Sequence, residues 1–212
     1  MDQDSAQWRL PNFSRPWYQK AMLLLPDLTH KKVLELGSGH GELAKILKPK
    51  VKSYTATDLS SKYVKQLNNQ GFTAVQADFN QKLPFKNKQF DLVITLEVVE
   101  HLAKAEEFLA EINRVLNPKG LLIISTPNIA WWGYRLFCLL GQPPKKEGYH
   151  LRFFTHHTMI KLLKKNNFII KKSASFTTIP LINRFLPKPI YPIIKTWPNL
   201  LAQNLVFLCQ KK

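Results

Sequence analysis

The sequence predicts an α/β fold in which a mostly parallel sheet is doubly wound, with helices on both faces. Short apolar runs, several of which end in glycine or an acidic residue, alternate with segments whose apolar residues recur at helical spacing. The 212 residues suffice for one domain over residues 1–212, with its core at about 30–175 and 202–210. A hydrophobic content of 45% is typical of a folded chain and argues against disorder.

The clearest local pattern is a short apolar run, Val33, Leu34 and Leu36, which ends in three glycines spaced two apart: Gly37, Gly39 and Gly41. We interpret it as a buried strand, a tight turn and then a helix from Glu42. Glycine suits such a turn because it takes positive φ at little cost and lets a ligand approach the backbone. Glu35, two residues before the first glycine, would repel a pyrophosphate but suits a ligand that carries positive charge.

The elements on either side follow from capping and breaker signals. Ser14 and Pro16 open a helix that ends before Pro26, and Ser60 opens another that stops at Gly71. Five further segments are predicted strands: 53–57, 72–76, 92–96, 121–125 and 168–175. Asp58 ends the first of these, 21 residues past Gly37, where a carboxylate suits a ribose diol.

The second half of the predicted domain begins with a helix from Ala105 to Leu116 and a turn at residues 117–120. Residues 128–148 are expected to be irregular, followed by a helix from about His156 to Asn166 and a last strand from Ala202 to Cys209. The aromatic-rich stretch 128–150 cannot join the sheet core, so we expect it to cap a substrate mouth, and we assign the proline-rich stretch 176–200 to the same cap.

Three stretches carry a family resemblance that spans about residues 30–170. The pattern Glu35-x-Gly37-x-Gly39-x-Gly41 is similar to the first motif of class I S-adenosylmethionine (SAM) methyltransferases, and "LPF…FDLV" leads into residues 92–96 as in that family. "EINRVLNPKGLLIISTPN" resembles its type-11 branch, which includes ubiquinone-pathway O-methyltransferases. The resemblance implies a Rossmann-like sheet of seven strands in the order 3-2-1-4-5-7-6, with the last strand antiparallel. It also implies SAM as cofactor and S-adenosylhomocysteine as product.

Carried over position by position, the resemblance assigns the cofactor site. Asp58 would bind the ribose, while Asp78 would bond the adenine amine and its neighbour Phe79 would flank the ring. The full expected set is Glu35, Gly37, Ser38, Gly39, Gly41, Asp58, Leu59, Asp78, Phe79, Leu96 and Glu97.

Methyl transfer to a hydroxyl needs a base with a pKa near neutrality, and His101 follows the strand where the methyl would be delivered. His101 is our first candidate for the catalytic residue and His150 our second. A structural role for His101, through a backbone hydrogen bond, stays open. We assign no metal ligands, but Glu97, Glu100, His101 and His150 have the oxygen and imidazole donors that a divalent ion takes.

Charge is strongly asymmetric. The net charge is +17, and residues 121–212 hold 14 basic residues against one acid, Glu147. This imbalance favours an anionic partner, although the 25 lysines among the 31 basic residues are also consistent with compositional bias. The polar start of the chain is not a signal peptide and no run is long enough to span a membrane, so we expect a cytoplasmic protein, with peripheral contact to an anionic inner membrane face left open.

Our leading hypothesis for the acceptor is a hydroxyl on a small or lipid-linked molecule. Aromatic residues and a basic segment together suit an apolar tail and a membrane surface. RNA 2′-O-methylation is the alternative, with bases stacked on Trp131 or Trp132. A SAM-binding module without activity is a third. The sequence does not indicate which acceptor is used, whether O, N or C is methylated, or the oligomeric state.

Overall fold

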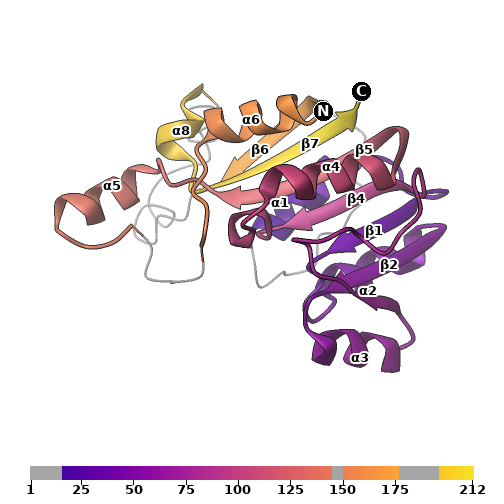
Figure 1. Cartoon of the computed structure of the whole chain (residues 1–212). Helices are drawn as coiled ribbons and strands as arrows, with labels where there is room; N and C mark the ends of the chain where they lie inside the picture. Colours follow the sequence, from indigo (N-terminus) through magenta and orange to yellow (C-terminus); the bar gives the residue numbers. More distant parts are fainter. Residues whose placement is uncertain (1–15, 145–149, 177–195) are drawn as a thin grey trace.

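A computed structural model describes residues 16–144, 150–176 and 196–212, and these form a seven-stranded sheet with helices packed against it (Figure 1). The strand order is β3-β2-β1-β4-β5-β7-β6, and β7 is antiparallel to both neighbours. The predicted order is therefore confirmed. The strands are β1 (Lys32–Leu36), β2 (Ser53–Asp58), β3 (Thr73–Gln76), β4 (Phe90–Leu96), β5 (Leu116–Pro127), β6 (Phe168–Phe176) and β7 (Asn204–Lys211).

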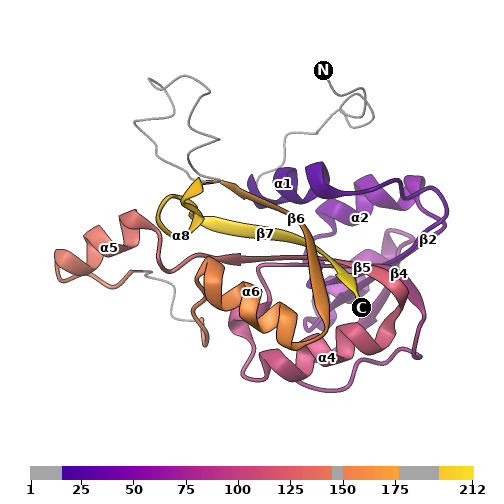
Figure 2. The same ribbon diagram turned by 90° about the horizontal axis from the view of Figure 1, so that it is seen from above.

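Helices cover both faces of the sheet (Figure 2). One face carries α1 (Pro16–Leu24), α2 (Glu42–Leu47) and α3 (Ser61–Asn69), and the other carries α4 (Ala105–Val115) and α6 (His156–Lys165). Val33 points to the first layer while Leu34 and Leu36 point to the second, and all three are fully buried. Burial on both faces explains why three of the four residues from Val33 to Leu36 are apolar.

The helix of residues 105–116 was predicted from apolar spacing, and α4 confirms it within a residue. Phe108, Leu109 and Ile112 lie at that spacing and are at most 1% exposed against the sheet. The predicted helix at residue 156 also begins there, because Thr155 and Thr158 form a reciprocal capping box. The predicted Ser14 cap of α1 lies outside the described residues.

The chain between β5 and α6 differs from the prediction. Residues 128–148 were expected to be irregular, but Trp132–Leu139 form a helix, α5, and residues 145–149 lie outside the described part. This helix is apolar nearly all round, so it lacks the periodic pattern that would have marked it. It projects beyond the strand ends, away from the body of the domain (Figures 1 and 2).

Strand β5 is longer than predicted, because it includes the expected turn at residues 117–120. The expected turn is present as a bulge within the strand. Phe90 pairs with Leu116 but Leu92 pairs with Leu121, and Lys119 in between has a φ of 60°. Short helices complete the fold: η2 (Lys48–Lys50), η3 (Val99–His101) and α8 (Pro198–Leu201). Across the three described ranges, no helix is both long and apolar enough to cross a membrane. Most of the predicted 176–200 cap lies outside those ranges.

Candidate functional site

The glycine turn connects β1 to α2 at the edge of the sheet where the parallel strands end. Gly37, Gly39 and Gly41 all have positive φ, at 85°, 49° and 75°. A Cβ on Gly37 would lie 2.5 Å from Cγ2 of Val98, and one on Gly41 would lie 2.4 Å from Cδ2 of Leu67. The backbone conformation favours glycine at all three positions, and at Gly37 and Gly41 a Cβ would also displace the neighbouring side chain.

Gly39 differs from the other two, because a Cβ there would meet no atom within 4 Å. Its backbone N–H donates a hydrogen bond of 2.9 Å to Oδ2 of Asp58, whose Oδ1 accepts a second from the Ser60 N–H, also at 2.9 Å. The side chain of Leu59 beside it is 61% exposed. The turn therefore offers an open surface bordered by an oriented carboxylate and an exposed apolar side chain.

Ser38 belongs to the structure of the turn. Its side chain is 2% exposed, and both its N–H and its hydroxyl donate to the carbonyl of Thr57, at 2.9 and 3.1 Å. The Gly37 N–H donates to the same carbonyl at 2.9 Å. These bonds fix the turn against the end of β2.

Glu35 lies beneath the turn and is 3% exposed. The hydroxyl of Tyr54 donates to its Oε2 at 2.6 Å. Burial raises the pKa of the Glu35 carboxyl to about 7, the Tyr54 hydrogen bond opposes that rise, and the charges of Asp58 and Glu42 add to it. The carboxyl thus sits at the balance between its neutral and ionised forms near neutral pH.

Asp78 and Phe79 follow β3. Oδ1 of Asp78 accepts a hydrogen bond from the Asn80 N–H at 2.9 Å, and Oδ2 accepts one from the Gln81 amide at 3.1 Å, as in an Asx turn. Phe79 is 7% exposed and packs on Phe108, with ring centroids 5.8 Å apart. Asp78 thus has the turn-forming contacts expected for a structural role, and Phe79 belongs to the core.

At the end of β4, Leu96 is 8% exposed and Glu97 takes a φ of 56°, which is unusual for a residue other than glycine. Its carboxylate accepts hydrogen bonds from the Ser125 hydroxyl and the Asn204 amide, each at 2.7 Å. Glu97 therefore ties together the ends of β4, β5 and β7. The sequence analysis missed Ser125 and Asn204.

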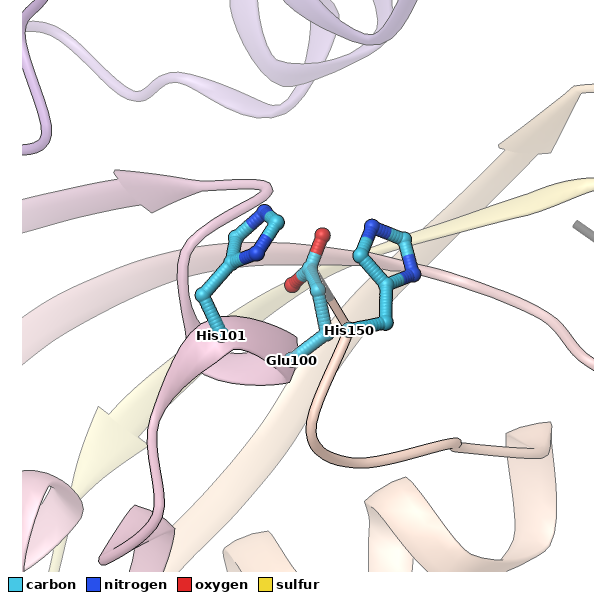
Figure 3. A group of neighbouring side chains, drawn as sticks. All are labelled: Glu100, His101 and His150. Atoms are coloured by element: carbon cyan, nitrogen blue, oxygen red, sulfur yellow. The ribbon is translucent and has the colours of Figure 1, made fainter. Parts of the chain in front are cut away.

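The structure brings together three of the four residues that the sequence offered as metal ligands. Ligand atoms of Glu100, His101 and His150 lie within 4.8 Å of one another (Figure 3). Glu100 and His101 come from η3, whereas His150 comes from the chain before α6, and the two imidazoles meet edge to face with centroids 4.7 Å apart. Glu97 lies outside this group, because its carboxylate contacts Ser125 and Asn204 instead.

A small cavity of about 10 Å³ adjoins this group, which we call the Glu–His cluster. Glu100 is 1% exposed, and Tyr134 of α5 is 6% exposed. The sequence analysis did not single out Tyr134 or Arg152 at this site. The cavity is lined by Glu100, Pro127, Ile129, Tyr134, His150, Arg152, Phe153 and Phe154.

Residues 11–172 match the methyltransferase domain family, and the chain therefore belongs to that family. The chain is 28% identical to a ubiquinone biosynthesis O-methyltransferase of Rickettsia bellii over 160 residues, which are 69% of this chain and 65% of that protein. It is 37% identical to a fatty-acid O-methyltransferase of Mycolicibacterium smegmatis over 105 residues, 46% of this chain and 37% of that one. The chain thus spans less than two thirds of the length of these relatives.

The fold is also that of solved methyltransferases. A SAM-dependent methyltransferase from Archaeoglobus fulgidus superposes with a TM-score of 0.70 at 18% identity, covering 91% of this chain and 92% of that one. A similar protein from Mesorhizobium loti gives 0.68 at 16% identity, covering 92% and 97%. At such identities the likeness establishes the fold. The predicted family and strand order are confirmed, while the individual site residues stay predictions.

Proposed function

We propose that the protein is a SAM-dependent methyltransferase that methylates a hydroxyl oxygen on a small or lipid-linked acceptor. The observation that carries this proposal is the open face of Gly39 beside the fixed carboxylate of Asp58. A nucleoside bound there would have its ribose hydroxyls within reach of that carboxylate and would place one face of its base against Leu59. Family membership and the relatives named as O-methyltransferases support transfer of the methyl group to an oxygen.

In this reaction the acceptor oxygen attacks the methyl carbon, and the carbon–sulfur bond of the sulfonium breaks as the new carbon–oxygen bond forms. The sulfur keeps the electron pair, and the acceptor releases its hydroxyl proton. The protein must align the three centres and provide a base for that proton. His101, on the short helix that follows β4, is the proposed base, with the His150 ring 4.7 Å away.

A divalent cation is the second candidate at this place. One carboxylate and two imidazoles would hold such an ion, which would orient the acceptor hydroxyl and lower its pKa. The two roles differ in their response to chelation. If His101 is the base, extensive dialysis against EDTA leaves turnover unchanged; if the cluster holds an ion, turnover falls and returns when Mg²⁺ or Zn²⁺ is added.

The proposed acceptor class rests on α5, whose Tyr134 lines the cavity beside the Glu–His cluster. Leu136, Phe137 and Leu139 of α5 and the next residue, Leu140, are exposed, with Leu139 at 83% and Leu140 at 66%. A projecting apolar helix in a half of the chain with 14 basic residues and one acid fits the headgroup region of an anionic bilayer. We propose peripheral contact with such a membrane, from which a lipid-linked acceptor would enter.

Two assays test these proposals. Methyl transfer from radiolabelled SAM is measured to a catechol carrying an isoprenoid tail, to palmitic acid and to a short RNA. Transfer to the catechol supports the proposed acceptor class, whereas transfer to RNA alone would contradict it. Transfer to palmitic acid alone would contradict a hydroxyl acceptor, because an ionised carboxylate is methylated without losing a proton. Flotation with phosphatidylglycerol vesicles should recover the wild-type protein but not the Leu139→Asp/Leu140→Asp double variant; equal recovery of both would contradict a role for α5.

A further inference from the structure

The Glu–His cluster is assembled from two segments that are distant in the sequence. Glu100 and His101 lie on η3, and His150 lies about fifty residues later, on the chain that leads into α6. In Figure 3 both imidazoles stand on either side of the Glu100 carboxyl, each from its own segment. A contact must therefore hold the second segment against η3 for the three side chains to meet.

Backbone hydrogen bonds make part of this contact. The N–H groups of Leu151 and Arg152 both donate to the carbonyl of Glu100, at 2.9 and 3.0 Å. A few residues on, the Ile129 N–H donates to the carbonyl of Phe154 at 2.9 Å. The segment is thus attached at two points, to η3 and to the chain just after β5.

The side chain of Arg152 also holds the His150 segment against the chain that follows η3. Its Nε donates to the carbonyls of Leu102 and Ala103, at 3.1 Å each, and its Nη2 also donates to the Ala103 carbonyl. Its Nη1 lies 3.4 Å from Oε2 of Glu106, at the start of α4. Arg152 lies two positions after His150, and its guanidinium contacts the chain that directly follows His101. It therefore joins the two segments that carry the histidines.

The chemistry of these contacts requires arginine. A guanidinium presents its N–H donors in a rigid planar fork, so one group can reach two carbonyls and a carboxylate together. A lysine at position 152 would keep the charge but not the fork. The ion pair contributes little by itself, because the side chains of Arg152 and Glu106 are 35% and 44% exposed.

We propose that Arg152 is a positioning residue, which holds the His150 segment on η3 so that His101, Glu100 and His150 form one site. That the assembled site serves catalysis rests on the proposed function, whereas the claim that Arg152 holds the segment in place does not. The structure supplies a matched control in Arg114, which makes a similar fork at a distance from the cluster. Arg114 donates to the carbonyls of Phe85 and Leu83, at 2.8 and 3.0 Å, and to Glu111.

The test compares Arg152→Gln, Arg152→Lys and Arg114→Gln in the full chain labelled with ¹³Cε1-histidine, without cofactor or acceptor. The His150 signal, identified by its loss in His150→Ala, senses the His101 ring at 4.7 Å. We expect it to shift in both Arg152 variants and to stay unchanged in Arg114→Gln. A signal that is unchanged in Arg152→Gln, or shifted equally in Arg114→Gln, would overturn the proposal.

Turnover provides a second reading once an acceptor is found. We expect Arg152→Gln to lower kcat at least tenfold, to leave the Kd for SAM within twofold, and not to be rescued by lysine. Wild-type kcat in Arg152→Gln would contradict the positioning role. If the wild-type protein transfers no methyl group to any acceptor, the proposed function fails, while the histidine spectra still decide whether Arg152 holds the segment.

Discussion

The hydroxyl of Tyr54 donates a hydrogen bond of 2.6 Å to the carboxyl of Glu35, within a site that is closed to solvent. Both groups belong to neighbouring parallel strands, β1 and β2, directly below the glycine turn. The pair places a carboxyl, with its pKa raised by burial to about 7, under the proposed position of a cationic ligand. Ionisation of Glu35 should therefore make the free energy of unfolding depend on pH.

Glu35→Gln tests this link. Because the carboxyl titrates at about 7 when folded and near 4.5 when unfolded, its stabilising contribution is complete below 4.5 and is lost as the pH rises through 7. We expect the wild-type free energy of unfolding to fall, relative to the variant, by roughly 2–3 kcal/mol between pH 5 and pH 8. Urea titrations at both pH values measure this free energy, with the exposed Glu107→Gln as control. The same change in unfolding free energy between pH 5 and pH 8 in wild type and Glu35→Gln would contradict the prediction.

Asp58→Asn should weaken SAM binding by about 10- to 100-fold, because it removes the charge from a proposed hydrogen bond to the ribose. Asp91→Asn is the matched control. Asp91 also accepts a backbone N–H bond, from Lys32 at 2.8 Å, but it lies near the opposite ends of the parallel strands. Calorimetric titration with SAM separates the two, and equal losses in both variants would argue against a role for Asp58 in the cofactor site.

His101→Ala should lower kcat by about 100-fold if the imidazole takes the proton of the acceptor, with the Kd for SAM nearly unchanged. His157→Ala serves as control, because His157 is exposed on the first turn of α6. Steady-state methyl transfer at saturating SAM measures kcat for both variants, with the acceptor found in the activity assay. A His101→Ala variant with wild-type turnover would leave His101 with only a structural role.

Local sequence signals predicted the fold well. Phe108, Leu109 and Ile112 marked α4 by their spacing, and the glycines marked the turn because their backbone conformations exclude other residues. The strand order came from the family resemblance, not from any local signal. The α5 helix was missed because its residues are apolar on nearly every side, so no period distinguishes it from irregular chain.

The candidate site was predicted only in part, because some of its contacts join residues far apart in the sequence. Asn204 reaches Glu97 from 107 positions away, and Arg152 reaches Ala103 from 49. No local pattern indicates such partners, since pairing of β7 with β5 and the course of the chain before α6 decide them. For the same reason Glu97 was grouped with the histidines, although its carboxylate contacts Ser125 and Asn204.

Binding of SAM to wild type and to Gly39→Arg, measured by isothermal titration calorimetry, tests the central claim most directly. Gly39 and Gly71 both have positive φ and open space at the Cβ position, so Gly71→Arg is a control with the same added charge and similar strain. We expect wild type and Gly71→Arg to bind SAM and Gly39→Arg to show no binding while it remains folded. Unchanged affinity in a folded Gly39→Arg variant would contradict a cofactor site at the glycine turn.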